Sequence, residues 1–147
     1  MYEGFYGLQE RPFALLPDPS FLFLSKGHST ALTLLRYSIL NRQGFTVVSG
    51  EVGSGKTTLI NRLLDEMKSG MTVGLINFTT RSFGEMAEWI MMAYGLPYKG
   101  KGKVELYDDF VQFMIREYAA GRPVVLIVDE AQNLGIRGLE EIRMLSN

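Results

Sequence analysis

Apolar positions recur along the chain with two periods that alternate from one segment to the next. Where they return every three or four residues they predict amphipathic helices, and where they form a short unbroken run they predict strands. Helices are expected from about Thr30 to Arg42, from the end of a glycine-rich loop to Gly70, from Ser82 to about Gly95, and from about Val104 to Ala120. Strands are expected over Phe45–Ser49, Thr72–Phe78 and Val124–Val128. Alternating elements of this kind favour an α/β fold.

Residues that commonly end helices support these boundaries. Ser29 is placed to cap the first helix and Gly44 to close it, while Ser82 and Glu85 have the spacing of a capping box. Gly121 is expected to stop the long helix that precedes the last strand. A final helix follows the last strand after a short turn.

The first 25 residues form an aromatic leader that three prolines, at positions 12, 17 and 19, keep from any regular element. It is too rich in apolar residues for a disordered tail, so we interpret it as an ordered arm. Phe5, Tyr6 and Phe13 could stack on a nucleotide base or cover the edge of a sheet, and both alternatives stay open.

The loop that follows Phe45–Ser49 fits the pattern G-x-x-x-x-G-K-[ST] at every fixed position. Glycines let the backbone bring its N–H groups close to a polyphosphate, and the helix that follows points its positive end at the same ligand. A lysine in this pattern reaches the β- and γ-phosphates, and the hydroxyl after it binds magnesium. The residues predicted to bind nucleotide are Gly50, Glu51, Val52, Gly53, Ser54, Gly55, Lys56, Thr57 and Thr58.

A second motif stands at the end of the last strand, where two carboxylates follow five consecutive aliphatic residues. Such a run is typical of a strand covered on both faces in a parallel sheet, and ligands bind beyond the carboxyl ends of such strands. We therefore expect Asp129 to hold Mg²⁺, together with Thr57, and Glu130 to orient and polarise an attacking water. Glu130 and Lys56 are the predicted catalytic residues, because γ-phosphoryl transfer depends mainly on positioning and charge neutralisation.

Composition narrows the class of protein without changing this site. A chain of 147 residues with 46% hydrophobic residues is the size of one domain with its own core. Fifteen basic and sixteen acidic residues give a formal charge of -1, so no global attraction to nucleic acid or membrane is expected. There is no cysteine, which excludes disulfides and fits a cytoplasmic location. No apolar run is long enough to span a bilayer, and the first residues do not look like a signal peptide.

Several short motifs along the chain occur together: Met1–Leu8, Arg11-Pro12-Phe13, Pro17-Asp18-Pro19, Leu22-Phe23-Leu24-Ser25, His28, Gly44-Phe45, the loop Gly50–Thr58, Asp129-Glu130-Ala131-Gln132-Asn133-Leu134, and the end Leu139–Asn147. With these motifs the chain resembles the general secretion pathway protein A family, AAA+ ATPases of type II secretion and of related pilus or exopolysaccharide systems. The leader is the specific part of the resemblance, because many P-loop proteins share both nucleotide motifs.

The resemblance implies a P-loop NTPase of the α/β class, an AAA+-type three-layer sandwich with a parallel sheet. It implies ATP and Mg²⁺ as ligands, a homo-oligomer, an inner-membrane secretion partner, and work at the cytoplasmic face of that membrane. Membrane contact would come only from regions beyond this chain, and no direct contact with nucleic acid is expected. Residues 1–147 would then be the N-terminal part of one ATPase domain, with the leader and first helix in 1–44 and the nucleotide-binding core in 45–147.

The resemblance also predicts parts that do not occur before Asn147, namely a sensor strand, an arginine finger and a helical lid. In the AAA+ sheet the sensor strand lies between the phosphate-loop strand and the strand that ends at Asp129. Without it, we expect a rearranged sheet or one completed by another molecule, because unpaired backbone groups are costly when buried. Weak ATPase activity is expected of the fragment, and neither Arg137 nor Arg143 is assigned as the finger.

Other readings of the same residues stay open. His28 could cap or pack the first helix or contact a ligand, and Gln132 and Asn133 could relay the state of the γ-phosphate or form a simple turn. The basic turn from Lys99 to Lys103 is either a solvated loop or a contact for DNA phosphates. Two alternative functions accompany these readings: an ATPase regulator of the DNA-transposition type, and a nucleotide-gated scaffold without turnover.

Overall fold

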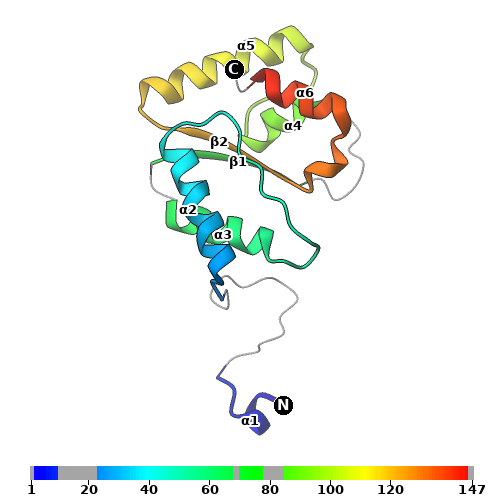
Figure 1. The fold of residues 1–147 in the computed structure, drawn as a ribbon. Coiled ribbons are helices and arrows are strands. Elements are labelled where there is room, and N and C mark those ends of the chain that lie inside the picture. The colour runs from blue at the N-terminus through cyan, green and yellow to red at the C-terminus, as the bar shows by residue number, and fades with distance from the viewer. Residues whose placement is uncertain (1, 10–22, 68–69, 78–84, 146–147) are drawn as a thin grey trace. The chain divides into compact units, whose positions relative to one another are not determined.

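A computed structural model describes residues 2–9, 23–67, 70–77 and 85–145 of the chain (Figure 1). It separates into two compact units, which we call the first unit (residues 1–37 and 47–66) and the second unit (residues 38–46 and 67–147). The division at residue 44 expected from the sequence stays a prediction. The elements are α1 (Tyr2–Tyr6), α2 (Lys26–Leu40), α3 (Lys56–Met67), β1 (Thr72–Asn77), α4 (Met86–Ala93), α5 (Lys103–Ala119), β2 (Val124–Asp129), η2 (Ala131–Asn133) and α6 (Gly135–Leu145).

Helix α2 begins four residues before the predicted start at Thr30, so the prediction that Ser29 caps it is wrong. The backbone N–H of His28 donates to Ser25 Oγ at 3.3 Å, and the N–H of Ser29 donates to the Ser25 carbonyl at 2.9 Å. Ser25 is therefore the residue that satisfies the first free N–H groups of the helix. At the other end Arg42 has a φ of 50°, a left-handed conformation that stops the helix just after Leu40.

The core of the first unit consists of leucines from its two long helices. Leu32 of α2 and Leu59 and Leu63 of α3 are each no more than 3% exposed. Leu59 and Leu63 are four residues apart, so they lie on one face of α3 as the apolar spacing predicted. An ion pair between Arg36 and Glu66 links α2 to α3, and hydrogen bonding to Arg36 is the main cause that lowers the pKa of Glu66.

The segment Phe45–Ser49 forms no strand, which corrects the prediction that a strand enters the phosphate loop. Phe45 is 49% exposed and Val47 is 84% exposed, so the run is not covered on both faces. The reason is physical: a strand needs a hydrogen-bonded neighbour, and in the part of the chain that the structure describes only β1 and β2 form a sheet. Completion of the sheet by another molecule stays a prediction.

The second unit is built on the parallel pair β1 and β2, in register from Thr72 opposite Val124 to Asn77 opposite Asp129. Helices α4 and α6 lie over the same face of this pair, and one apolar cluster joins strand and helices (Figure 1). The cluster contains Ile76 of β1, Met86 and Ile90 of α4, and Ile142 of α6. This packing fixes the edge of the sheet at which Asp129 lies.

The predicted ends of α4 and α5 shift by a few residues in α4, which runs from Met86 to Ala93, and by one residue at each end of α5. Helix α4 starts at Met86, and Glu85 is its N-cap in extended conformation rather than the third residue of a capping box; Ser82 and Phe78 lie outside the described residues. Helix α5 runs from Lys103 to Ala119 rather than from Val104 to Ala120. Its first turn begins earlier because Glu105 accepts a hydrogen bond from the Gly102 N–H at 2.9 Å.

Glycine is required at position 74 in the middle of β1. A Cβ added there would lie 2.8 to 3.1 Å from three ring atoms of Tyr94, the residue that ends α4. The Tyr94 ring packs in turn against Phe113 of α5, with ring centroids 5.0 Å apart, and its burial raises the pKa of the phenol. The absent side chain thus lets the end of α4 lie directly on the strand.

A buried acid fastens the end of α5 to the start of β1. Glu117 is 8% exposed, accepts hydrogen bonds from Arg122 at 2.8 and 2.6 Å, and accepts another from the hydroxyl of Thr72. Hydrogen bonding to Arg122, followed by that to Thr72, lowers the pKa of Glu117 to about 2. The contacts hold the end of α5 at the start of β1, where Thr72 is in register with the first residue of β2.

This depressed pKa predicts a pH dependence of stability. Folded Glu117 takes up a proton only near pH 2, whereas the unfolded chain does so near 4.5, so its stabilising contribution is complete above pH 4.5 and is lost as the pH falls toward 2. Thermal unfolding of Glu117→Gln is therefore expected to have a lower midpoint than wild type at pH 7, with the gap closing between pH 4.5 and 2. The exposed variant Glu140→Gln is the control, and a gap that stays constant across this range would contradict the prediction.

Candidate functional site

The phosphate-loop pattern folds as an irregular loop over residues 50–55 that runs directly into α3 at Lys56. Gly53 has a φ of +77° and Gly55 a φ of +84°, values that other residues adopt only with strain. The requirement for glycine predicted from the sequence is confirmed at both positions. The backbone is thereby free to turn its N–H groups toward one side of the loop.

The loop closes tightly on itself at its base. A Cβ added to Gly50 would lie 2.8 Å from Ser54 Oγ, so the serine hydroxyl would have to turn away to make room for a side chain there. The Ser54 N–H donates to the Glu51 carbonyl at 3.2 Å, and Lys56 Nζ donates to the carbonyls of Gly50 at 2.9 Å and Glu51 at 2.8 Å. The ammonium group therefore lies over the loop that is proposed to cradle phosphates.

Helix α3 presents its N-terminal end to the same loop. Its first residues are Lys56, Thr57 and Thr58, and the Leu59 N–H donates to the Gly55 carbonyl at 2.9 Å, which closes the first turn. Buried Leu59 and Leu63 anchor the helix, while Glu51 to Ser54 and Thr57 are exposed. The positive end of the helix dipole and Lys56 are thus open to an anion from solvent.

His28 contacts this loop, which the sequence did not indicate. Its Nε2 lies 2.8 Å from the carbonyl oxygen of Ser54, and its Nδ1 lies 2.7 Å from Ser25 Oγ. The capping role in the first helix belongs to Ser25 instead. A contact across 26 positions leaves no periodic signal in a single sequence, so only the folded structure shows that His28 contacts the loop.

The acidic pair lies at the end of β2 in a strained turn. Asp129 is the last residue of the strand, and Glu130 follows with φ 55° and ψ 39°, a left-handed conformation that is uncommon for residues other than glycine. The Glu130 N–H donates to Asp129 Oδ1 at 3.0 Å, and the side-chain amide of Gln132 donates to a carboxylate oxygen of Glu130. The left-handed residue at position 130 turns the backbone out of the extended course of the strand.

Asn77 is a further candidate that the sequence analysis missed. It ends β1 in register with Asp129, so the two residues stand side by side at the carboxyl edge of the sheet. The sequence would have indicated Asn77 if the register of β1 and β2 had been known, because Asn77 is the residue opposite Asp129. An exposed amide at this place could hydrogen bond to whatever the carboxylates bind.

The two motifs lie in different units, the loop from Gly50 to Thr58 in the first and Asp129 with Glu130 in the second. Their convergence on one ligand stays a prediction. Among the described residues no group of three or more His, Cys, Asp or Glu side chains could hold a metal by itself. The donors that the sequence assigns to Mg²⁺, the Thr57 hydroxyl and the Asp129 carboxylate, are hard oxygens, and this ion usually takes one or two carboxylates besides water and substrate phosphates.

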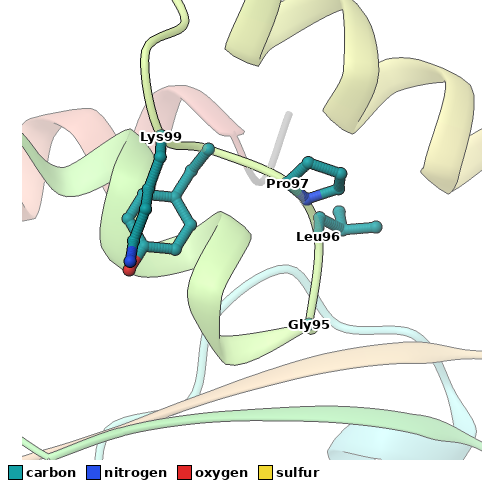
Figure 2. Close-up of a pocket in the computed structure, with 5 residues that line it drawn as sticks. Gly95, Leu96, Pro97 and Lys99 are labelled. Atoms are coloured by element: carbon teal, nitrogen blue, oxygen red, sulfur yellow. The ribbon is translucent and has the colours of Figure 1, made fainter.

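The connection between α4 and α5, which includes the basic turn, lies away from both motifs along the chain. The connection between α4 and α5 surrounds an open pocket of about 380 Å³, with Leu96 and Pro97 at one end and Lys99 at the other (Figure 2). In the basic turn, Lys101 forms an ion pair with Asp109 and Lys103 forms one with Glu85 at 2.9 Å. These acidic partners weaken the case for DNA contact there.

Arg143, one of the two arginines after Glu130, has an acidic partner. Arg143 Nε lies 3.0 Å from a carboxylate oxygen of Glu140 one turn earlier on α6. No function is assigned to Arg137 or Arg143. Within residues 2–9, 23–67, 70–77 and 85–145, no helix combines the length and apolar character needed to cross a membrane.

Comparisons with known proteins agree with the fold and with the resemblance seen in the motifs. The profile of a family described as "AAA domain" matches residues 39–147, which is more than half of the chain. The chain is 36% identical over its whole length to "General secretion pathway protein A" of Aeromonas hydrophila, and it spans 27% of the length of that protein. No solved structure matches. The predicted AAA+-type α/β fold and the predicted resemblance are both confirmed, and the chain belongs to the AAA domain family.

Proposed function

We propose that this chain binds and hydrolyses ATP and that it drives the assembly of a secretion or pilus apparatus. The observation that carries the proposal is the phosphate loop, with positive φ at Gly53 and Gly55 and with Lys56 Nζ over the loop carbonyls. Together with the N-terminal end of α3, these groups supply oriented N–H donors and positive charge for a triphosphate.

The residues divide the proposed chemistry between them. Lys56 neutralises charge on the β- and γ-phosphates, and the backbone of residues 50–55 holds them in place. Glu130 accepts a proton from a water that attacks the γ-phosphorus, the bond from phosphorus to the β,γ-bridging oxygen breaks, and ADP and phosphate leave. Thr57 and Asp129 would hold Mg²⁺, which adds further neutralisation of the phosphate charge. The amide of Gln132 keeps the Glu130 carboxylate oriented in the meantime.

The cellular role rests on similarity. The relative from Aeromonas hydrophila is named for the general secretion pathway, and identity of 36% extends over the whole chain, leader included. We therefore propose the same kind of system here, with a homo-oligomer and an inner-membrane partner protein at the cytoplasmic face of that membrane.

Ligand-induced stabilisation of the wild-type chain tests the proposal. ATP with Mg²⁺ at about 100 times its dissociation constant should stabilise the fold by about 2.7 kcal/mol, because only the folded loop binds it. AMP, which lacks the β- and γ-phosphates, should raise the unfolding midpoint much less. Equal midpoints with and without ATP would refute nucleotide binding. Binding without phosphate release, in a protein extended beyond Asn147, would instead support a scaffold without turnover.

A further inference from the structure

His28 takes part in three hydrogen bonds, two with Ser25 at the start of α2 and one with Ser54 of the phosphate loop. A single tautomer of its ring accounts for all of them. The Ser54 carbonyl can only accept, so the hydrogen must be on Nε2 of the imidazole. In the neutral ring Nδ1 is then an acceptor, and the Ser25 hydroxyl donates to it at 2.7 Å. The same hydroxyl oxygen accepts the backbone N–H of His28 at 3.3 Å.

The hydrogen bond from His28 to the Ser54 carbonyl orients the whole Ser54–Gly55 peptide. In a planar trans peptide the C=O and the following N–H point in opposite directions, so holding the Ser54 carbonyl also sets the direction of the Gly55 N–H. That N–H points away from the imidazole. The ring also lies against the next residue, since a Cβ added to Gly55 would be 3.4 Å from His28 Nε2.

The hydrogen bond from His28 is needed because the sequence of the loop does not by itself favour one orientation of the Ser54–Gly55 peptide. Glycines at positive φ stand on both sides of Ser54, and glycine adopts both signs of φ with similar ease. Rotation of the Ser54–Gly55 peptide changes ψ of Ser54 and φ of Gly55, and glycine adopts the new φ without steric cost. A rotated peptide would turn the carbonyl oxygen, rather than the N–H, toward an anion in the loop.

We propose that His28 is a positioning residue for the phosphate loop. Held in the Nε2–H form by Ser25, it keeps the Ser54–Gly55 peptide in the orientation that offers an N–H to the phosphates. The inference deepens the proposed function and rests on it. It also connects the leader to the nucleotide site, because Ser25, the last residue of the leader, sets the tautomer of the ring that contacts the loop.

Affinity for a fluorescent ATP analogue, with Mg²⁺, tests the proposal in the 147-residue chain. His28→Ala should weaken binding about five- to tenfold, the range expected when one oriented hydrogen bond is lost. His28→Gln, whose amide N–H can replace Nε2–H, should restore most of the affinity. Ser25→Ala should lose less than His28→Ala, and the double variant no more than His28→Ala alone. The matched control is Glu66→Gln, which breaks the α2–α3 ion pair in the same unit and should leave affinity unchanged.

A spectroscopic measurement separates positioning from a general effect on folding. The chain has one histidine, so its two ring nitrogens give unambiguous ¹⁵N signals. The Nε2–H tautomer should dominate in wild type and be lost in part in Ser25→Ala. An Nδ1–H tautomer, or unchanged ATP affinity in His28→Ala while wild type binds, would overturn the inference alone. If wild type binds no ATP, the proposed function fails and this inference fails with it.

Discussion

Replacing Glu130 with glutamine is expected to lower the rate of ATP turnover at least about a hundredfold, the contribution typical of a general base. Affinity for ATP should stay within about threefold of the wild-type value, because the lost group acts on the attacking water and not on the ligand's ground state. Glutamine has the same shape as glutamate and cannot accept the proton. The change therefore removes the chemistry and keeps the side chain's volume.

The structure of the turn around Glu130 indicates that glutamine at this position leaves the local fold unchanged. The left-handed backbone of Glu130 is held by its own N–H bond to Asp129 Oδ1, which the substitution does not touch. The amide of Gln132 can donate to the carbonyl oxygen of the new side chain as it does to the carboxylate. Asp129, the proposed ligand of Mg²⁺, keeps its charge. Loss of turnover could not then be attributed to a displaced strand end.

Phosphate release is the measurement, in a protein extended beyond Asn147 with ATP and Mg²⁺ in excess. Glu140→Gln on α6 removes the same charge from an exposed ion pair and should turn over at the wild-type rate. Turnover in Glu130→Gln equal to that of the control would exclude Glu130 as the base. Parallel loss of ATP affinity would instead show that Glu130 acts in binding.

The phosphate loop and α3 could be predicted from the sequence because their determinants are local. Glycine at positions 53 and 55 predicts the positive φ angles that the structure has there. The spacing of Leu59 and Leu63 predicts the buried face of the helix. The same holds for β2, whose aliphatic run ends at Asp129 as expected. In each case residues close together in the sequence are enough to predict the local structure.

Predictions failed where the outcome depends on a distant partner. The composition of Phe45–Ser49 suits a strand, but a strand exists only beside another, and none pairs with this segment in the described chain. Similarly, Ser25 and Ser29 are equally good caps by composition. Ser25 is the cap because its hydroxyl serves both the His28 N–H and the His28 ring, whose other nitrogen contacts Ser54.

Removing the side chain of Lys56 is expected to weaken ATP binding about a hundredfold, since hydrogen bonds from a charged donor to phosphate contribute about 1.5–3 kcal/mol. In Lys56→Ala the loop also loses the two hydrogen bonds from Nζ to the carbonyls of Gly50 and Glu51. Both carbonyls are in exposed residues, so water can replace the lost donor. Stability without nucleotide should therefore change little.

This contrast between binding and stability is what makes Lys56 informative. Titration with a fluorescent ATP analogue gives the affinity, and thermal unfolding without nucleotide gives the stability of the same samples. Lys99→Ala, which removes an equal charge from the connection between α4 and α5, should leave both values at the wild-type level. Lys56→Arg keeps the charge, but a planar guanidinium is a poor substitute for a compact ammonium close to the loop, so it should recover affinity only in part. Full recovery with arginine would mean that charge alone matters and that the position of Nζ over the loop does not.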